Sequence, residues 1–250
     1  MIIPGLVSVT FRNKTPLEIV KLCNQANLSA IEWGGDVHVP PKGGNAAEIR
    51  RMTADHGLTV SSYGSYYRVT QPMDDLRTCL DTAAELGTDV MRIWCGVKGS
   101  KDAEEERKSI VDQLIQCAEE ARARKITLAL EYHGRTLTDD RSSVQRLMKE
   151  TACVFDALKF YWQPRFDWSE KEILASLDDV RPLLSHLHVF TWLYDGKGFI
   201  RKPLSDAEAL WKKVFSSIKE DHYALMEFVQ DDSDEALLRD AAALNSWIQR

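Results

Sequence analysis

The chain has 250 residues, of which 44% are hydrophobic and 28% are charged, and its formal net charge is −6 with a pI near 5.6. This length suits one large α/β barrel or two smaller domains, and the composition is that of a folded globular protein rather than a disordered one. The negative charge argues against non-specific binding to nucleic acid or to an anionic membrane, because it repels phosphate groups.

Features that would place the chain outside the cytoplasm are missing from the sequence. The apolar runs are far shorter than the roughly 20 residues that a membrane span needs, and the first residues, MIIPGLVSVTF, lack the basic start and cleavage site of a signal peptide. The five cysteines are widely spaced without a CxxC pair, which argues against a disulfide framework. We therefore expect a cytoplasmic protein with no membrane or nucleic-acid partner.

Short runs rich in β-branched and aromatic residues recur along the chain and predict eight strands. The predicted strands cover residues 2–9, 29–33, 58–64, 89–95, 126–132, 158–162, 186–190 and 223–229. Between them, helical periodicity predicts helices at residues 16–27, 45–56, 73–86, 102–124, 140–151, 169–178, 205–219 and 232–248. Thr15 and Ser205 are predicted N-caps, whereas Gly57 and Gly87 are predicted to end their helices.

Eight alternating strand and helix units predict an α/β fold with a single (β/α)₈ TIM barrel domain over residues 1–250. The alternative is a doubly wound open sheet. That fold would place a glycine-rich phosphate-binding turn after the first strand, but the segment there, VSVTFRNKTP, has none. We therefore expect a closed barrel, with its chemistry at the carboxyl ends of the strands.

Polar side chains end the last four predicted strands. Glu131 and His133 lie two residues apart and so face the same way. Glu131 and Glu227 would face each other across the barrel mouth, with Gln163 and His188 on the strands between them. Carboxylates buried there need a cation, and this mixed set of oxygen and nitrogen donors suits Mn²⁺, Mg²⁺, Co²⁺ or Zn²⁺. We predict a divalent-metal site formed by Glu131, Gln163, His188 and Glu227.

Other strand ends supply candidate substrate contacts. His38 lies in a loop rich in proline and glycine after the second strand, and such loops often contact ligands. Tyr63 and Trp94 could stack on the apolar face of a sugar, although aromatic residues are also common in cores. Arg92 and His133 are candidates for orienting substrate hydroxyl groups.

Two further expectations concern the seventh strand and the loop after it. His186 is expected to be structural and to face the helices, whereas His188 faces the site. The loop carries Trp192, Tyr194 and Phe199, which are expected to form either a lid or a contact in a homo-oligomer.

With these strand ends and the segments IEWGGDVHVPP, SSYGSYYR and MRIWCG, the chain resembles the sugar phosphate isomerase/epimerase family of xylose isomerase-like TIM barrels. The resemblance spans essentially the whole chain but rests on short motifs. It implies one divalent metal, commonly manganese (Mn²⁺), on four ligands that correspond to Glu131, Gln163, His188 and Glu227. Such relatives usually carry Asp-x-x-His on strand 6, where this chain has Gln163 and Phe166. The neutral amide should weaken metal binding, and Asp167 is the alternative ligand.

The predicted function is a metal-dependent sugar isomerase or epimerase, with a small sugar or keto-sugar as substrate. Glu131 and Glu227 would be the catalytic groups that move a proton next to a carbonyl through an enediolate. A dehydratase or lyase acting on a keto-sugar with the same metal site is one alternative. A catalytically silent sugar-binding barrel is the other, suggested by Gln163 and Phe166.

Overall fold

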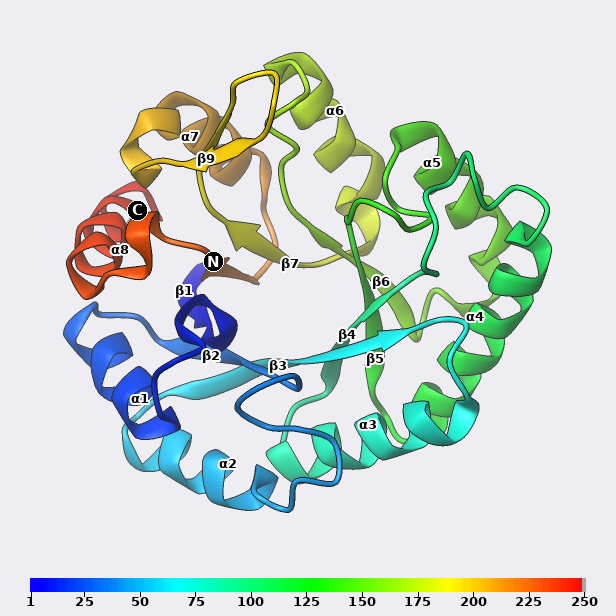
Figure 1. Cartoon of the computed structure of the whole chain (residues 1–250), viewed down its shortest axis with the longest axis horizontal. Helices are drawn as coiled ribbons and strands as arrows, with labels where there is room; N and C mark the ends of the chain where they lie inside the picture. Colours follow the sequence, from blue (N-terminus) through cyan, green and yellow to red (C-terminus); the bar gives the residue numbers. More distant parts are fainter. Residues whose placement is uncertain (249–250) are drawn as a thin grey trace.

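In residues 1–248, which the computed structural model describes, eight parallel strands close into a barrel in the order β1-β10-β7-β6-β5-β4-β3-β2 (Figure 1). The barrel strands are β1 (Ile2–Val7), β2 (Ala30–Gly34), β3 (Thr59–Arg68), β4 (Val90–Trp94), β5 (Thr127–Glu131), β6 (Leu158–Trp162), β7 (Leu184–Val189) and β10 (His222–Met226). Successive barrel strands pair with one another, β7 with β10 among them, and β1 pairs with β10 to close the ring. The predicted TIM barrel is confirmed.

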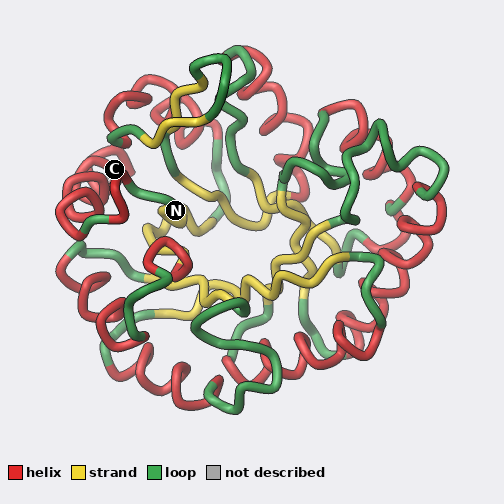
Figure 2. The backbone as a smooth tube through the Cα atoms, in the orientation of Figure 1, coloured by secondary structure: helices red, strands yellow, loops and turns green. Residues whose placement is uncertain are grey.

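Helices surround the barrel as an outer ring (Figure 2). They are α1 (Pro16–Gln25), α2 (Ala46–Asp55), α3 (Met73–Leu86), α4 (Arg107–Ala123), α5 (Arg141–Glu150), α6 (Glu170–Val180), α7 (Glu208–Ser217) and α8 (Asp234–Ile248). Their apolar faces pack on the outside of the strands and form the main hydrophobic core. None of these helices combines the length and apolar character that crossing a membrane requires.

Most of the predicted helix ends are present. The Thr15 side chain accepts a hydrogen bond from the Glu18 backbone, and Glu18 reaches back to the Thr15 backbone, which completes a capping box. Gly57 and Gly87 follow α2 and α3 with φ of +76° and +82°, a conformation that favours glycine. The predicted cap at Ser205 is wrong, because a 3₁₀ turn intervenes and α7 begins three residues later without a side-chain cap.

The loop after β7 contains a hairpin that the strand pattern did not predict. Strands β8 (Trp192–Tyr194) and β9 (Phe199–Arg201) pair in antiparallel fashion beside the barrel mouth, near α7 in Figure 1. The turn between them is held by Asp195, whose carboxylate accepts backbone hydrogen bonds from Lys197 and Gly198. Strands of three residues are too short to show a periodic pattern, which explains why the sequence did not reveal them.

Both histidines of β7 lie inside the barrel, so the expectation that His186 faces the helices is wrong. Residues two apart on a strand share a face, and His186 and His188 therefore both point inward. His186 is buried with its ring nitrogens against the backbone oxygens of Ser185 and Ser61, whereas His188 lies one layer closer to the mouth. These contacts give His186 the structural role that was expected of it.

Candidate active site

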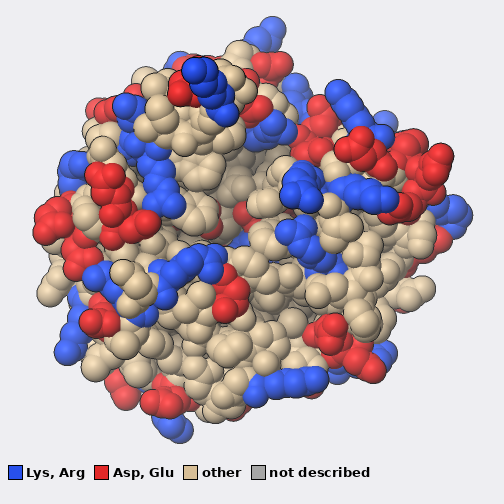
Figure 3. Space-filling view, in the orientation of Figure 1, with Lys and Arg blue, Asp and Glu red and all other residues tan. Residues whose placement is uncertain are grey.

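A cavity of about 350 Å³ opens at the carboxyl ends of the strands. Figure 3 shows the hollow near the centre of this face, with arginine and lysine side chains around its rim. Six of the nine predicted site residues line it: Arg92, Trp94, Glu131, His133, Gln163 and Glu227. Since these residues come from β4, β5, β6 and β10 or the loops after them, the cavity lies where barrel enzymes carry their chemistry.

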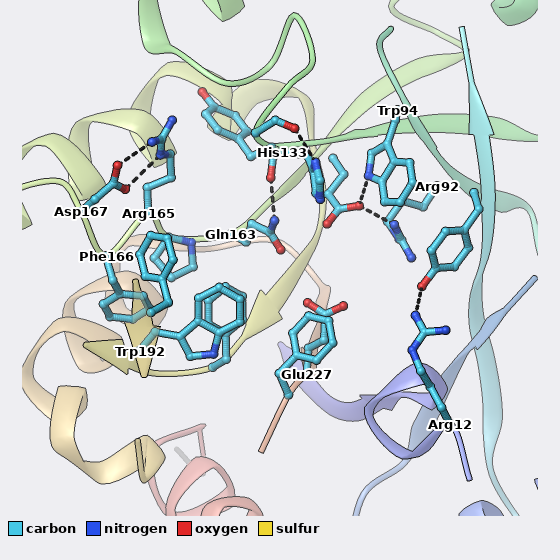
Figure 4. A pocket seen from close by; sticks show the side chains of 18 residues that line it. Arg12, Arg92, Trp94, His133, Gln163, Arg165, Phe166, Asp167, Trp192 and Glu227 are labelled. Carbon is cyan, nitrogen blue, oxygen red and sulfur yellow. Dashed lines mark hydrogen bonds and ion pairs between the residues drawn. The ribbon is translucent and has the colours of Figure 1, made fainter. Parts of the chain in front are cut away.

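The four predicted metal ligands converge at the floor of this cavity. Nδ1 of the fully buried His188 lies 2.9 Å from Oε1 of Gln163, 3.4 Å from Oε2 of Glu227 and 3.6 Å from Oε1 of Glu131. The amide nitrogen of Gln163 donates to the backbone oxygen of Tyr132 at 2.6 Å, which turns the amide oxygen toward His188. In Figure 4, Gln163 and Glu227 point into the same space.

This donor set fits a divalent ion, but the four side chains are not yet at metal-coordinating distances from a common point. An ion bound at about 2.1 Å to each ligand separates neighbouring ligand atoms by about 3.0 to 3.4 Å. The separations around Nδ1 of His188 are close to that range, so small side-chain adjustments would suffice. No group of three His, Cys, Asp or Glu side chains within residues 1–248 is already arranged to hold a metal. The proposed set also includes the amide oxygen of Gln163, which is not one of these residue types.

The alternative ligand Asp167 is committed to another partner. Both of its carboxylate oxygens accept hydrogen bonds from Arg165, at 2.5 and 3.1 Å. Figure 4 shows the pairing of Arg165 with Asp167. Arg165 also donates to the backbone oxygen of Asp139, so the pair is tied to the neighbouring loop. The geometry therefore favours Gln163 over Asp167 as the strand-6 ligand.

A buried ion-pair network supports one of the two glutamates. Arg92 donates from Nε to Glu32 at 2.8 Å and from Nη1 to Glu131, and Trp94 donates to the same oxygen of Glu131 at 2.5 Å. Glu32 also accepts from Ser62 at 2.9 Å. Buried carboxylates are stable only when they are paired, and here one guanidinium joins two of them. The remaining oxygen of Glu131 is the one that faces His188.

The network separates the pKa values of the two predicted catalytic glutamates. Burial by itself raises the pKa of Glu131, but Arg92 and His188 outweigh burial and hold this pKa at about 2. Burial and repulsion by Glu131 raise the pKa of Glu227 to about 7, although His188 opposes the rise. Glu131 is therefore ionised at neutral pH, whereas Glu227 exchanges its proton there.

His188 carries a proton in the absence of a metal. Burial lowers its pKa, but the negative charges of Glu227, Glu131 and Glu32 outweigh burial and raise the pKa to about 10. Nε2 of His188 has no hydrogen-bond partner among residues 1–248 and faces Glu32 at 3.7 Å. The imidazolium thus supplies positive charge where a bound cation would supply it.

Two predicted substrate contacts are corrected by their placement. His38 is buried, with Nδ1 against Ser8 Oγ at 3.0 Å and Nε2 against the Lys14 backbone oxygen at 3.2 Å. Tyr63 is also buried, and its hydroxyl donates to the backbone oxygen of Val39 at 2.9 Å. Neither side chain lines the cavity, because each is held in the interior by these hydrogen bonds.

The sequence interpretation missed several residues of the site. Glu32 was recognised only as a strand end, and its partner Arg92 lies 60 residues away in the sequence. Tyr66, and not the predicted Tyr63, lines the cavity. The reason is that β3 continues past its predicted end with a register irregularity, and Tyr66 adopts φ of +60° there. The Tyr66 hydroxyl accepts a hydrogen bond from Arg12 at 3.1 Å at the cavity rim. The aromatic residues of the segment SYYR, directly after the predicted end of this strand, were the sequence feature that could have indicated Tyr66.

Comparison with known proteins identifies the family. The sequence profile described as xylose isomerase-like TIM barrel matches residues 20–247. The chain belongs to this family. No curated protein matches the chain. Within this xylose isomerase-like fold, the chain is similar to the probable 3-DHS dehydratase AsbF from Bacillus anthracis, which is involved in petrobactin synthesis. The identity is 18%, the coverage is 98% of this chain and 99% of that one, and the TM-score is 0.81.

Two other members of the fold class are instructive. A D-psicose 3-epimerase from Clostridium cellulolyticum, solved with D-tagatose, has a TM-score of 0.69 at 14% identity, over 98% of this chain and 97% of that one. A xylose isomerase-like TIM barrel protein from Mycobacterium smegmatis, in complex with magnesium, has a TM-score of 0.71 at 12% identity, over 98% of each chain. At these identities the likeness establishes the fold alone.

Proposed function

We propose that this chain is a divalent-metal-dependent sugar isomerase or epimerase that removes a proton next to a carbonyl group. The observation that carries the proposal is the convergence of Glu131, Gln163 and Glu227 on Nδ1 of His188, all within 3.6 Å, at the floor of an open cavity. These four side chains would hold the ion, with Mn²⁺ as the first choice and Mg²⁺, Co²⁺ or Zn²⁺ as alternatives. When bound, the ion would polarise the substrate carbonyl and stabilise the enediolate.

The side chains of the site have different proposed roles in proton transfer and substrate binding. Glu227 is the proposed base, because its carboxylate lines the cavity and lies against His188 rather than in an ion pair with an arginine. Glu131 is fixed by Arg92 and Trp94, so it is better suited to holding charge and position than to taking up a proton. His133 lies on the cavity wall with its ring 4.8 Å from Trp94, where it can orient a substrate hydroxyl.

A dehydratase or lyase acting on a keto-sugar is the second candidate. Arg92 and Trp94 hold one oxygen of Glu131, whereas Glu227 lies against His188, so the two carboxylates are not equivalent. An elimination next to a carbonyl needs only one base. An epimerase that works on both faces of an intermediate would need two.

Solvent deuterium exchange tests the proposal. Purified protein, supplied with Mn²⁺ or with a chelator, is incubated in D₂O with free and phosphorylated ketoses and with keto-sugars, and NMR follows the hydrogen next to the carbonyl. We expect exchange with Mn²⁺ and none with the chelator. A product isomeric with the substrate identifies an isomerase or epimerase, and a product that has lost water identifies a dehydratase.

A catalytically silent barrel makes the opposite prediction. Such a protein would purify without a divalent metal, and a chelator would leave its melting temperature unchanged. An occupied site stabilises the fold by mass action, so we expect the melting temperature to rise with added Mn²⁺. No exchange with any substrate, together with no thermal shift, would remove the proposal. The cytoplasmic location remains a prediction.

A further inference from the structure

The side of the cavity opposite Arg92 is built from five aromatic rings. They come from the loop after β6, the end of β7, the hairpin β8–β9 and the segment after β10, and we call them the aromatic wall: Phe166, Phe190, Trp192, Phe199 and Phe228. Figure 4 shows Phe166 and Trp192 on one side of Glu227, and Arg92, Trp94 and Arg12 on the other.

The rings of the aromatic wall touch one another and form a continuous surface. Trp192 is its centre, with ring centroids 4.6 Å from Phe190, 5.3 Å from Phe199 and 5.8 Å from Phe228. Phe166 extends the surface through Phe190 at 5.9 Å. Because the rings come from four separate segments, their convergence on the cavity is not a by-product of one strand and indicates a binding surface.

The aromatic wall is partly open to water. Phe199 is 47% exposed, and it lies on the same face of the hairpin as Trp192, so both rings border the cavity. Phe228 presents its ring from a backbone with φ of +52°, a strained conformation for a phenylalanine. Contiguous exposed apolar surface in a cavity marks a binding site, and backbone strain concentrates at functional positions.

The opposite side of the cavity has the reverse character. There the aromatic residues make polar contacts: Trp94 donates to Glu131 at 2.5 Å, and Tyr66 accepts from Arg12 at 3.1 Å. On the aromatic wall only Trp192 has a polar atom, and its indole nitrogen has no hydrogen-bond partner in residues 1–248. A ligand that satisfies both sides must have a polar half and a flat apolar half.

We infer that the substrate is a keto-sugar derivative that carries an aromatic ring, such as an aryl glycoside whose sugar ring holds the carbonyl group. The polar half lies against Glu131, Gln163 and Glu227, and the aryl group packs on the aromatic wall. A sugar ring alone stacks on one or two aromatic side chains, whereas this surface has five. The assignment of the sugar half rests on the proposed function, whereas the assignment of the aryl half rests only on the geometry of the aromatic wall.

Matched ligand pairs test this inference on the Mn²⁺-supplied protein. The probes are non-reacting analogues without the carbonyl: the 4-nitrophenyl and methyl β-glycosides of D-glucose and of D-galactose, with 4-nitrophenol alone as a further control. Titration calorimetry measures their affinity. We expect at least one aryl glycoside to bind about tenfold or more tightly than its methyl partner and than 4-nitrophenol, because burying an aromatic ring is worth that much.

Substitutions in the hairpin test whether the preference for aryl glycosides comes from the aromatic wall. Phe199→Ala removes a ring that is 47% exposed, and Trp192→Ala removes the centre of the wall. Each substitution should reduce the aryl preference to about threefold or less. Leu193→Ala is the matched control, because Leu193 is 49% exposed on the other face of the same hairpin and should leave the preference unchanged.

The outcomes separate this inference from the proposed function. Equal affinity for aryl and methyl glycosides, no measurable binding of any aryl glycoside at millimolar concentration, or a preference that survives both ring deletions would overturn the aromatic-ring assignment, even if ketoses exchange their protons. A clear aryl preference without any metal-dependent exchange would support the assignment and overturn the proposed enzyme, leaving a barrel that binds aryl sugars.

Discussion

The two sides of the cavity are stabilised in different ways. On the side of β2, β4 and β5, Glu32, Arg92 and Glu131 are nearly inaccessible to water and are joined by charge-assisted hydrogen bonds. On the side of the hairpin, the side chains of Trp192 and Phe199 are partly exposed and pack against other aromatic rings. Directional bonds fix a group to within a fraction of an ångström, whereas apolar packing tolerates small shifts.

This difference suggests a division between reaction and recognition. The ion-pair network keeps the charge and position of Glu131 constant, as a metal ligand requires. Two rings of the aromatic wall, Trp192 and Phe199, lie on a short hairpin that can adapt to the shape of a ligand, which is also compatible with the lid expected of this loop. The following predictions test the network first and the ligand set afterwards.

The largest effect is expected from Arg92→Met. The substitution leaves Glu32 and Glu131 buried without a cation, and breaking a buried ion pair costs about 3–5 kcal/mol. Urea denaturation of the metal-free protein should show this loss in the free energy of unfolding. Arg12→Met is the control, since its ion pair with Asp36 is partly exposed and should contribute less than about 1 kcal/mol. Equal losses in the two variants would contradict the role given to the network.

The next effect concerns the base. Glu227→Gln should lower metal-dependent exchange of the substrate hydrogen by a factor of about 10² to 10⁴, because the amide cannot accept the proton. Circular dichroism should show an unchanged fold. Glu220→Gln makes the same chemical change at an exposed position just before β10 and should retain full exchange. Retained exchange in the Glu227 variant would exclude it as the base.

Metal binding should depend on pH through His188. Its pKa is raised to about 10, so a proton must leave before the imidazole can bind an ion. The affinity for Mn²⁺ should therefore rise as pH rises, by about tenfold per unit between pH 8 and 9, where Glu227 is already ionised and about one proton is released. Below pH 7 the rise should be steeper, because Glu227 also loses a proton. Calorimetry in buffers of different ionisation enthalpy counts that proton, and His188→Asn should bind more weakly and with a flatter pH dependence. A proton count near zero in the native chain would show that His188 is not a ligand.

The smallest effect distinguishes the two strand-6 candidates. Gln163→Asp restores a carboxylate and should tighten Mn²⁺ binding by about tenfold, since ligand charge sets the affinity for hard cations. Asp167→Asn should change affinity by less than about twofold, because this carboxylate is bound to Arg165. A larger loss from the Asp167 variant than any change at Gln163 would reverse the ligand assignment.

Several features of the protein could be predicted from local sequence. The alternation of strands and helices indicated the barrel, Thr15 and Gly87 marked helix ends, and the last four strands placed Glu131, His188 and Glu227 at the mouth. These predictions succeed because hydrophobic periodicity and capping depend on residues that are close together in the chain.

Other features depend on how distant strands align. Tyr63 was chosen over Tyr66 because the irregularity in β3 follows from its pairing with β4, which no local pattern reveals. The bond from Arg92 to Glu32 also joins different strands, and their alignment is set by closure of the whole barrel.

The sequence by itself determined the barrel and the residue types at the end of each strand. Only the tertiary structure decided which of those side chains meet, for example that Arg92 neutralises Glu131 while Glu227 keeps a raised pKa. The physical reason is that pairing, burial and electrostatic repulsion are properties of the space between strands, and that space is created by the closed sheet.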